Sequence, residues 1–216
     1  MAGTLAGFTY RFEHARDSAQ PPILLLHGTG GDESDLVPLG QAVAPGAALI
    51  SPRGKVLENG QPRFFRRLAE GVLDEDDIRI RASELVAFID QARARHDLAA
   101  PIALGFSNGA NIAAAVMILH PGVLAGAILL RAMPPFGEDQ PGESLGGRPV
   151  LLVSGVMDPI VPVASATRLG FQLRQRGATV AHELLPAAHQ LSQGDIALAR
   201  AWLAGPAGQT GSAAIT

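Results

Sequence analysis

A serine between two glycines is the residue of this sequence best suited to covalent chemistry. The segment Gly105–Gly109 (GFSNG) follows the apolar run Pro101–Leu104 and precedes helical spacing over Ala110–Met117. A strained turn from strand to helix lifts a serine hydroxyl clear of the backbone, and flanking glycines avoid a Cβ clash there. The pattern predicts Ser107 as a nucleophile, with a serine in a purely structural turn as the alternative.

Two later loops offer the base and the acid that a serine nucleophile needs. The apolar run Val150–Val153 leads to Asp158, and the run Thr179–Leu185 leads to His189. A base must take the hydroxyl proton, and a carboxylate orients that base. The chain order serine, aspartate, histidine, each after a strand, therefore predicts a catalytic triad. The alternatives are a turn-forming aspartate before proline for Asp158 and a solvent-exposed loop histidine for His189.

The other histidines and a second aspartate fit these roles less well. His27 precedes the serine in the chain, and Asp195 follows His189 in or beside the last predicted helix. The remaining histidines fall within predicted strands or at the ends of predicted helices: His14, His182, His96 and His120.

A glycine-rich loop directly after the apolar run Ile23–Leu26 is the predicted site for a developing oxyanion. The loop is His27–Asp32 (HGTGGD). Backbone amides from such a loop and from the residue after the nucleophile hold the negative oxygen in this chemistry. We predict the N–H groups of Thr29 and Asn108 for this role, with His27 bracing the loop. A phosphate cradle is the alternative, but neither G-x-G-x-x-G nor a Walker lysine is present.

Alternating strand and helix patterns must position these loops. Short apolar runs predict buried strands, a half-polar run predicts an edge strand at Phe8–His14, and intervening spacing predicts helices. Strand–helix–strand units of this length favour a mainly parallel sheet with right-handed crossovers, which is the α/β class. The buried strands are Ile23–Leu26, Ala47–Ile50, Ile102–Phe106, Ala127–Leu130 and Val150–Val153, with Thr179–Leu185 more polar, and the helices are Leu36–Val43, Ile78–Ala92, Ala110–Leu119, Val163–Arg176 and Ile196–Leu203.

Composition excludes several classes of protein. The 216 residues suit one domain, which we place at residues 1–204, with a disordered tail of small and polar residues expected at 205–216. A net charge of −3 gives no reason to expect a nucleic-acid partner, and the lack of cysteine excludes disulfides and thiolate chemistry. We see no signal peptide or membrane span, so we expect a cytoplasmic protein without a membrane partner. All but one of the 17 basic residues are arginine, which is typical of a GC-rich bacterial genome.

The sequence resembles the phospholipase/carboxylesterase family, which includes the acyl-protein thioesterases. The resemblance covers about Ile23 to Leu203 and lies in LLHGTGGDE, GFSNGA, SGVMDPIVP and AAHQLS. It implies an α/β-hydrolase fold with a mainly parallel central sheet, helices on both faces and no large lid. It also implies a serine esterase without metal or other cofactor, and frequently a homodimer.

One segment resembles a bacterial subgroup linked to hydroquinone resistance. It is SPRGKVLENGQPRFFRRLAEG (Ser51–Gly71), where acyl-protein thioesterases and broad carboxylesterases carry a Trp-Phe-Asp-type segment. Asn108 also stands where those relatives commonly have glutamine. The different segment argues against lipid-like or acyl-protein substrates, while Asn108 keeps the backbone donor and changes the side-chain contacts available there.

Aromatic and basic side chains in this segment predict contacts with a substrate. We expect residues among Arg63, Phe64, Phe65, Arg66 and Arg67 to line the pocket mouth and select an aromatic or anionic ester. In the alternative, both phenylalanines pack in the core and the arginines are solvated or pair with residues 74–77. Further predicted pocket walls, each of which could instead be core, are Met133, Phe136, Met157 and Ile160.

The expected function is hydrolysis of small carboxylic esters, with aromatic esters as one option, through an acyl-enzyme. A thioesterase or lysophospholipase with the same triad is the nearest rival. A catalytically silent binding protein on the same scaffold is the rival from another class, because a fold does not guarantee an activity.

Overall fold

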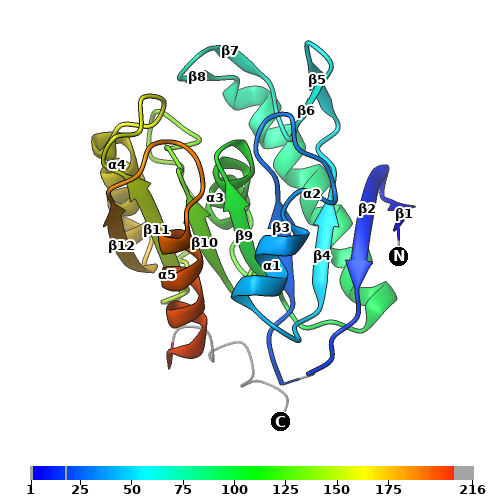
Figure 1. The fold of residues 1–216 in the computed structure, drawn as a ribbon. Helices are drawn as coiled ribbons and strands as arrows, with labels where there is room; N and C mark the ends of the chain where they lie inside the picture. Colours follow the sequence, from blue (N-terminus) through cyan, green and yellow to red (C-terminus); the bar gives the residue numbers. More distant parts are fainter. Residues whose placement is uncertain (1, 18, 207–216) are drawn as a thin grey trace.

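The computed structural model describes residues 2–17 and 19–206 and places them around an eight-stranded sheet (Figure 1). The strand order is β1-β2-β4-β3-β9-β10-β11-β12, parallel from β4 onward and antiparallel at the two first pairings. The strands are β1 (Ala2–Leu5), β2 (Phe8–Glu13), β4 (Leu49–Pro52), β3 (Ile23–Leu26), β9 (Ile102–Phe106), β10 (Gly126–Leu130), β11 (Pro149–Gly155) and β12 (Thr179–Leu185).

Short apolar runs form the central strands because both faces of the sheet are covered. Successive side chains of a strand point to opposite faces, so Leu24 and Leu26 join one core cluster while Ile23 and Leu25 join the other. The same division holds in β9, β10 and β11, whose residues alternate between the two clusters. The mainly parallel sheet with covered faces confirms the predicted α/β-hydrolase fold.

Five helices supply the covering layers. Apolar residues of α2 (Glu75–His96), α3 (Asn108–Leu119) and α4 (Val163–Gln175) pack in the first cluster. Residues of α1 (Val37–Val43) and α5 (Gln193–Ala204) pack in the second, and these two helices lie in front of the sheet in Figure 1. The side chain of Asp74 caps α2 by accepting from the Asp77 N–H, which explains the acidic run before the helix.

The prediction that Phe8–His14 forms an edge strand is wrong. The segment forms β2, with the alternating burial that its sequence indicates, but β1 pairs with its outer side. The sequence AGTL of β1 is exposed on three of its four residues, so it carries no apolar pattern that could have announced a strand.

Two connections near the carboxyl edge of the sheet differ in their secondary structure. The connection from β4 to α2 contains two small hairpins, β5 (Val56–Glu58) with β6 (Gln61–Arg63) and β7 (Arg67–Ala69) with β8 (Val72–Leu73), which the sequence analysis did not predict. In Figure 1 both rise above this edge. The connection from β10 to β11, residues 131–148, contains neither helix nor strand, in agreement with the absence of a large lid.

The expected tail falls mostly outside the described residues, since 207–216 are not among them. The single domain at 1–204 and the tail therefore remain predictions. In the described part of the chain, no helix is both long and apolar enough to span a membrane.

Candidate active site

Ser107 lies in the tight turn between β9 and α3. Its φ of 51° falls in the left-handed region, which a residue with a Cβ enters at a cost. Glycine is needed on both sides: a Cβ at Gly105 would lie 2.6 Å from the carbonyl oxygen of Gly109, and one at Gly109 would overlap the backbone of Leu26. The Ser107 N–H donates to the carbonyl of Leu130, 2.9 Å away, which ties the turn to β10.

The structure brings Ser107, His189 and Asp158 together, although they come from three separate loops. The Nε2 atom of His189 lies 3.0 Å from the Oγ of Ser107, and its Nδ1 lies 2.8 Å from Asp158 Oδ2. The Asp158 side chain is almost fully buried, while Ser107 and His189 are partly exposed. The hydroxyl can thus be reached from solvent while the carboxylate behind it is shielded.

Hydrogen bonds keep Asp158 ionised. Burial alone would raise its pKa, but the N–H groups of Val161 and Ile160 and the ring of His189 outweigh burial, so its pKa lies below the ordinary value. An ionised carboxylate can only accept, so the Nδ1 of His189 carries the hydrogen. In the neutral ring Nε2 is then free to accept the proton of Ser107.

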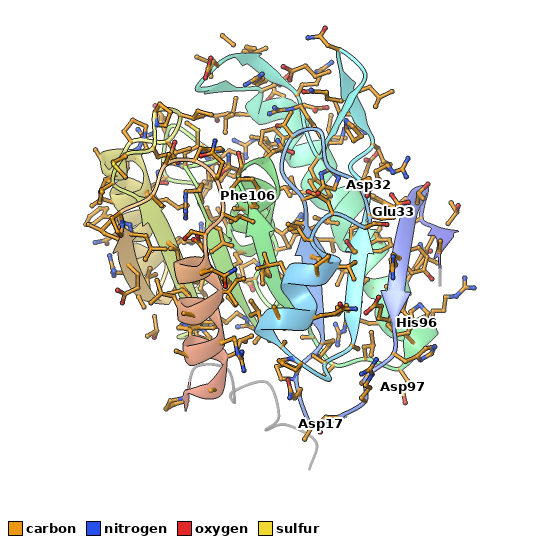
Figure 2. The ribbon with its side chains drawn as sticks, viewed as in Figure 1. Asp17, Asp32, Glu33, His96, Asp97 and Phe106 are labelled. Carbon is orange, nitrogen blue, oxygen red and sulfur yellow. The ribbon has the colours of Figure 1, made fainter. Side chains whose placement is uncertain are left out.

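The loop after β3 meets the turn of Ser107 at one edge of the sheet. Figure 2 labels Phe106, directly before Ser107, and Asp32 and Glu33 of the loop at this edge, while His96 lies near the opposite one. His27 braces the loop: its Nδ1 donates to the Gly28 carbonyl at 2.6 Å, and its Nε2 accepts from the Gly54 N–H at 3.0 Å. Burial holds the pKa of His27 below its ordinary value, which keeps this doubly bonded ring neutral.

The segment around β6 holds the residues predicted as oxyanion donors. Arg63 Nη1 donates to Thr29 Oγ1 at 2.7 Å, and the Phe64 N–H donates to Asn108 Oδ1 at 2.7 Å. The Gly30 N–H donates to the carbonyl of Pro62 at 2.9 Å. Because Asn108 is the first residue of α3, its own N–H has no partner within the helix.

A second serine–histidine pair lies in the sheet itself. Ser154 Oγ of β11 is 2.9 Å from His182 Nε2 of β12. Ser154 is buried within a regular strand, whereas Ser107 projects from a strained turn. Among the side-chain hydrogen bonds of residues 2–17 and 19–206, none joins a carboxylate to His182. The Ser107 site is therefore the better equipped for nucleophilic attack.

The residues predicted to contact substrate divide into buried and exposed ones. Phe64 and Phe65 are core residues, as in the alternative interpretation. Arg63 is also buried, with bonds to Phe65 O and Thr29 and an ion pair with Glu58. The Arg66 side chain is 62% exposed and pairs with Asp74 at 2.9 Å. Of residues 63–67, Arg66 and Arg67 are the exposed ones, and Arg67 pairs with Glu58.

Three further predicted pocket residues lie on loops that lead to or from the site. Met157 and Ile160 flank Asp158 and are 62% and 41% exposed, so they form an apolar rim beside the triad. Met133 is partly buried, and its N–H donates to Asn111 Oδ1, one helical turn after Ser107. Phe136, the other residue of this group, is core.

A buried ion pair that was not predicted from the sequence lies behind His189. Arg131, directly after β10, pairs with Asp195 of α5 at 2.7 Å. Two signals were available: a lone arginine at the end of a buried strand, and the Ser192–Asp195 spacing of a capping box, which the structure contains. Asp195, which the sequence predicts to fit the role of triad acid poorly, instead accepts hydrogen bonds from Arg131 and Ser192.

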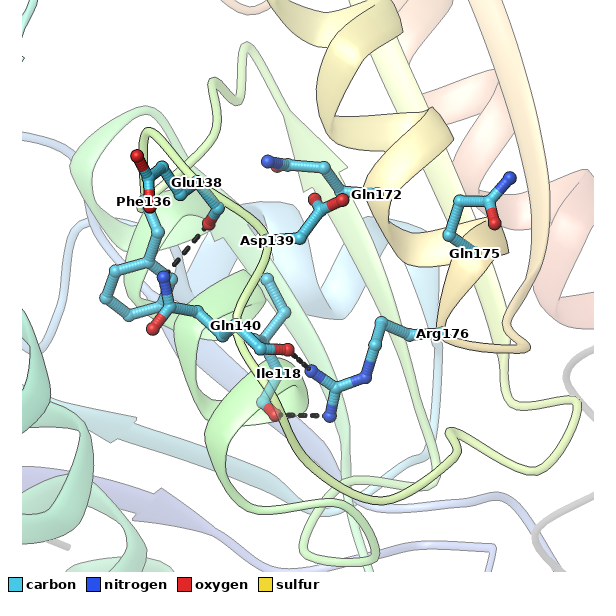
Figure 3. Close-up of a pocket in the computed structure, with 8 residues that line it drawn as sticks. All are labelled: Ile118, Phe136, Glu138, Asp139, Gln140, Gln172, Gln175 and Arg176. Atoms are coloured by element: carbon cyan, nitrogen blue, oxygen red, sulfur yellow. Dashed lines mark hydrogen bonds between the residues drawn. The ribbon is translucent and has the colours of Figure 1, made fainter.

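A small pocket lies at the other end of α3 (Figure 3). Its cavity volume is about 60 Å³, and Ile118, Phe136 and Arg176 are among its lining residues. Ile118 is eleven positions after Ser107, which is about 16 Å along a helix, so this pocket is separate from the triad. In the described residues no cluster of three metal-ligating side chains occurs.

A family model described as phospholipase/carboxylesterase matches residues 10–204, which include the whole site. The chain belongs to this family. Membership makes it a serine hydrolase, and the carboxylic ester hydrolases of the family share the fold described above.

Individual relatives in the phospholipase/carboxylesterase family agree in sequence and fold. The putative hydrolase MhqD of Bacillus subtilis is 45% identical over 183 residues, covering 83% of this chain and 90% of its own. The crystal structure of a Bacillus cereus carboxylesterase superposes with a TM-score of 0.87 at 40% identity, covering 90% and 92% of the two chains. A Mesorhizobium loti carboxylesterase gives 0.88 at 34% identity, covering 95% and 99%.

Proposed function

We propose that this hydrolase cleaves small carboxylic esters through Ser107, His189 and Asp158. The observation that carries the proposal is the continuous relay from Ser107 Oγ through both ring nitrogens of His189 to the ionised Asp158. A base within hydrogen-bond reach of the nucleophile, itself oriented by a carboxylate, is the arrangement that acyl transfer requires.

The proposed reaction has two steps. His189 Nε2 takes the proton of Ser107 as Oγ attacks the ester carbonyl, and the same proton passes to the leaving alcohol when the acyl-enzyme forms. Water then attacks the acyl group while His189 takes a proton from it. The bond between the acyl carbon and Ser107 Oγ breaks, His189 returns the proton to Oγ, and the carboxylic acid is released. Asp158 supports the imidazolium in both steps.

Thr29 and Asn108 supply the proposed oxyanion donors. The neighbouring amides of Gly30 and Gly31 donate to Pro62 and Gly28, so the Thr29 N–H is the amide of this turn that we assign to the oxyanion. The Asn108 N–H lies at the first residue of α3, and the N-terminal end of a helix stabilises a negative charge placed beside it.

The exposed apolar rim suits a substrate whose acyl group or alcohol group is small and either aliphatic or aromatic. Met157 and Ile160 offer apolar surface beside the triad, and Met133 remains a candidate wall. We keep Arg66 as the candidate for anion selection, in competition with its partner Asp74. Substrate contact by Arg63, Phe64 and Phe65 would require these buried side chains to move, so we favour a supporting role for them. A homodimer and a cytoplasmic location also remain proposals.

A substrate panel tests the proposed function. Wild type and Ser107→Ala would be assayed on p-nitrophenyl acetate, p-nitrophenyl butyrate, a long-chain ester and an acyl thioester. We expect turnover of the two short esters that the variant loses. Preference for the thioester or the long chain would favour the thioesterase or lysophospholipase rival, and binding of a small aromatic without turnover would favour a silent scaffold.

Charge selection by Arg66 has a matched control in Arg67, which pairs with Glu58 on the same segment. We expect Arg66→Ala to lower the ratio of anionic to neutral ester hydrolysis, and Arg67→Ala to leave it near that of wild type. An unchanged ratio in Arg66→Ala would remove Arg66 from the substrate site.

A further inference from the structure

The ion pair behind the catalytic histidine is fully buried. Arg131 and Asp195 are each 0% exposed, and the guanidinium meets the carboxylate in two bonds of 2.7 and 3.0 Å. Burying charge is costly even in a good pair, and apolar side chains of similar volume often stabilise a fold equally well. The pair is therefore best explained by a role that needs hydrogen-bond donors, which apolar side chains lack.

The same guanidinium holds the backbone on both sides of His189. Arg131 Nε donates to the carbonyl of Ala188 at 3.0 Å, and Nη2 donates to that of Gln190 at 3.0 Å. A planar group with five fixed donors can bind two carbonyls and both oxygens of a carboxylate at once, whereas the ammonium group of lysine has only three donors. The orientation of the loop that carries the imidazole is thereby set from behind.

The backbone at Arg131 reaches the other two triad loops. The carbonyl of Leu130 accepts from the Ser107 N–H, and the Arg131 N–H donates to Val153 of β11, the strand that leads to Asp158. Arg131 has a φ of 56°, a left-handed conformation that costs energy for a residue with a Cβ. From this turn the side chain reaches the histidine loop, where it donates to the carbonyls of Ala188 and Gln190.

We propose that Arg131, neutralised by Asp195, is a positioning residue that fixes His189 between Ser107 and Asp158. The inference rests on the proposed triad and adds to it a residue that touches neither substrate nor reacting atoms. A shift of about 1 Å in a catalytic group can cost about 100-fold in rate, so the loop anchor should act on kcat.

Two variants separate positioning from stability. The double variant Arg131→Met with Asp195→Leu replaces the pair by apolar side chains and removes the hydrogen bonds to the carbonyls of Ala188 and Gln190. The variant Arg131→Lys keeps a positive charge for Asp195 but loses the planar set of donors. Arg176→Met is the matched control, because Arg176 donates to the carbonyls of Gln140, Ile118 and Glu143 at the far pocket shown in Figure 3.

The experiment measures kcat and KM per folded molecule, with hydrogen exchange of the amides of residues 187–191. We expect kcat to fall about 100-fold in the double variant and about tenfold in Arg131→Lys, with KM changed less than about threefold. Exchange at 187–191 should rise in both, while Arg176→Met keeps the kcat and loop exchange of wild type.

Failure of this inference is distinguishable from failure of the proposed function. If wild type hydrolyses no ester, the function fails, and loop exchange alone then decides the inference. Wild-type kcat and exchange in the folded double variant, or in Arg131→Lys should the double variant not fold, would overturn it.

Discussion

The backbone N–H of Phe64 donates to the side-chain Oδ1 of Asn108, with 2.7 Å between the two atoms. The preceding residue, Arg63, donates to Thr29 Oγ1. Two consecutive residues thus hold both segments whose amides we propose as oxyanion donors. Preorganised donors lower the barrier because they need no rearrangement as charge develops. Residues 63 and 64 should therefore influence rate without touching the substrate.

Thr29→Val tests the first of these bonds. Valine keeps the shape of threonine and its backbone N–H, but it cannot accept from Arg63. We expect kcat for p-nitrophenyl acetate to fall about tenfold, which is less than the loss of a donor itself. Thr29→Ser keeps the hydroxyl and should stay close to wild type. Equal kcat values for the two variants would show that the Arg63 bond does not hold the loop.

Asn108→Ala tests the second bond, with Asn111→Ala as its control. Both asparagines are buried in α3, and both accept a backbone N–H from a loop, Phe64 in one case and Met133 in the other. Each loss leaves an N–H without its acceptor, so the free energy of unfolding should fall by about 1–3 kcal/mol in urea titrations. Only Asn108→Ala should also lower kcat clearly. A similar kcat loss in both would indicate general loosening of α3.

Asp158→Asn should cost about 10³- to 10⁴-fold in kcat, because an amide can donate to His189 and favour the wrong tautomer. Its remaining acceptor oxygen can still bind the N–H groups of Val161 and Ile160, so the variant should fold. Ser154→Ala, assayed beside it, should retain activity. The reverse pattern would move the active site to Ser154 and His182.

The stability of the protein should fall between neutral and mildly acidic pH. Burial lowers the pKa of His27, so the unfolded chain binds its proton more readily than the folded protein does. Stability from this residue is complete above the ordinary histidine pKa of about 6.5 and is lost as pH falls through the lowered value. His27→Gln keeps an acceptor for Gly54 without titrating.

Urea midpoints for wild type and His27→Gln at about pH 7.5 and about pH 5.5 would check this expectation, since an unperturbed histidine titrates between them. We expect the smaller acid-induced drop in the variant. The part that remains would belong to other groups, such as His96 and His182, whose pKa values burial also lowers. Equal drops in the two proteins would contradict the assignment to His27.

Local patterns predicted the central strands, the helices and the three residues that we propose as the triad. The strands β3, β9 and β12 begin and end at the residues predicted for them. Such features follow from short-range requirements, namely side-chain alternation in strands and the glycines of the Ser107 turn.

The supports of the site could not be predicted in this way because they join distant segments. Arg131 and Asp195 are 64 positions apart, and Arg63 and Thr29 are 34 apart. Local signals mark Arg131 as a lone arginine after a buried strand and Asp195 as part of a capping box, but they do not show that the two side chains meet. For the same reason Arg63, Phe64 and Phe65 were predicted at the pocket mouth, with the core as the alternative for both phenylalanines, and the fold buries all three. The strand β1 was missed because it is short and exposed.

Labelling by a fluorophosphonate probe tests the central claim most directly. Such a probe reacts with a serine whose proton is taken by a neighbouring base, and the mass of the labelled peptide identifies the serine. We predict one adduct, on Ser107, that is absent in Ser107→Ala, retained in Ser154→Ala and strongly slowed in His189→Ala. Labelling of Ser154, or unchanged labelling in Ser107→Ala, would contradict the account.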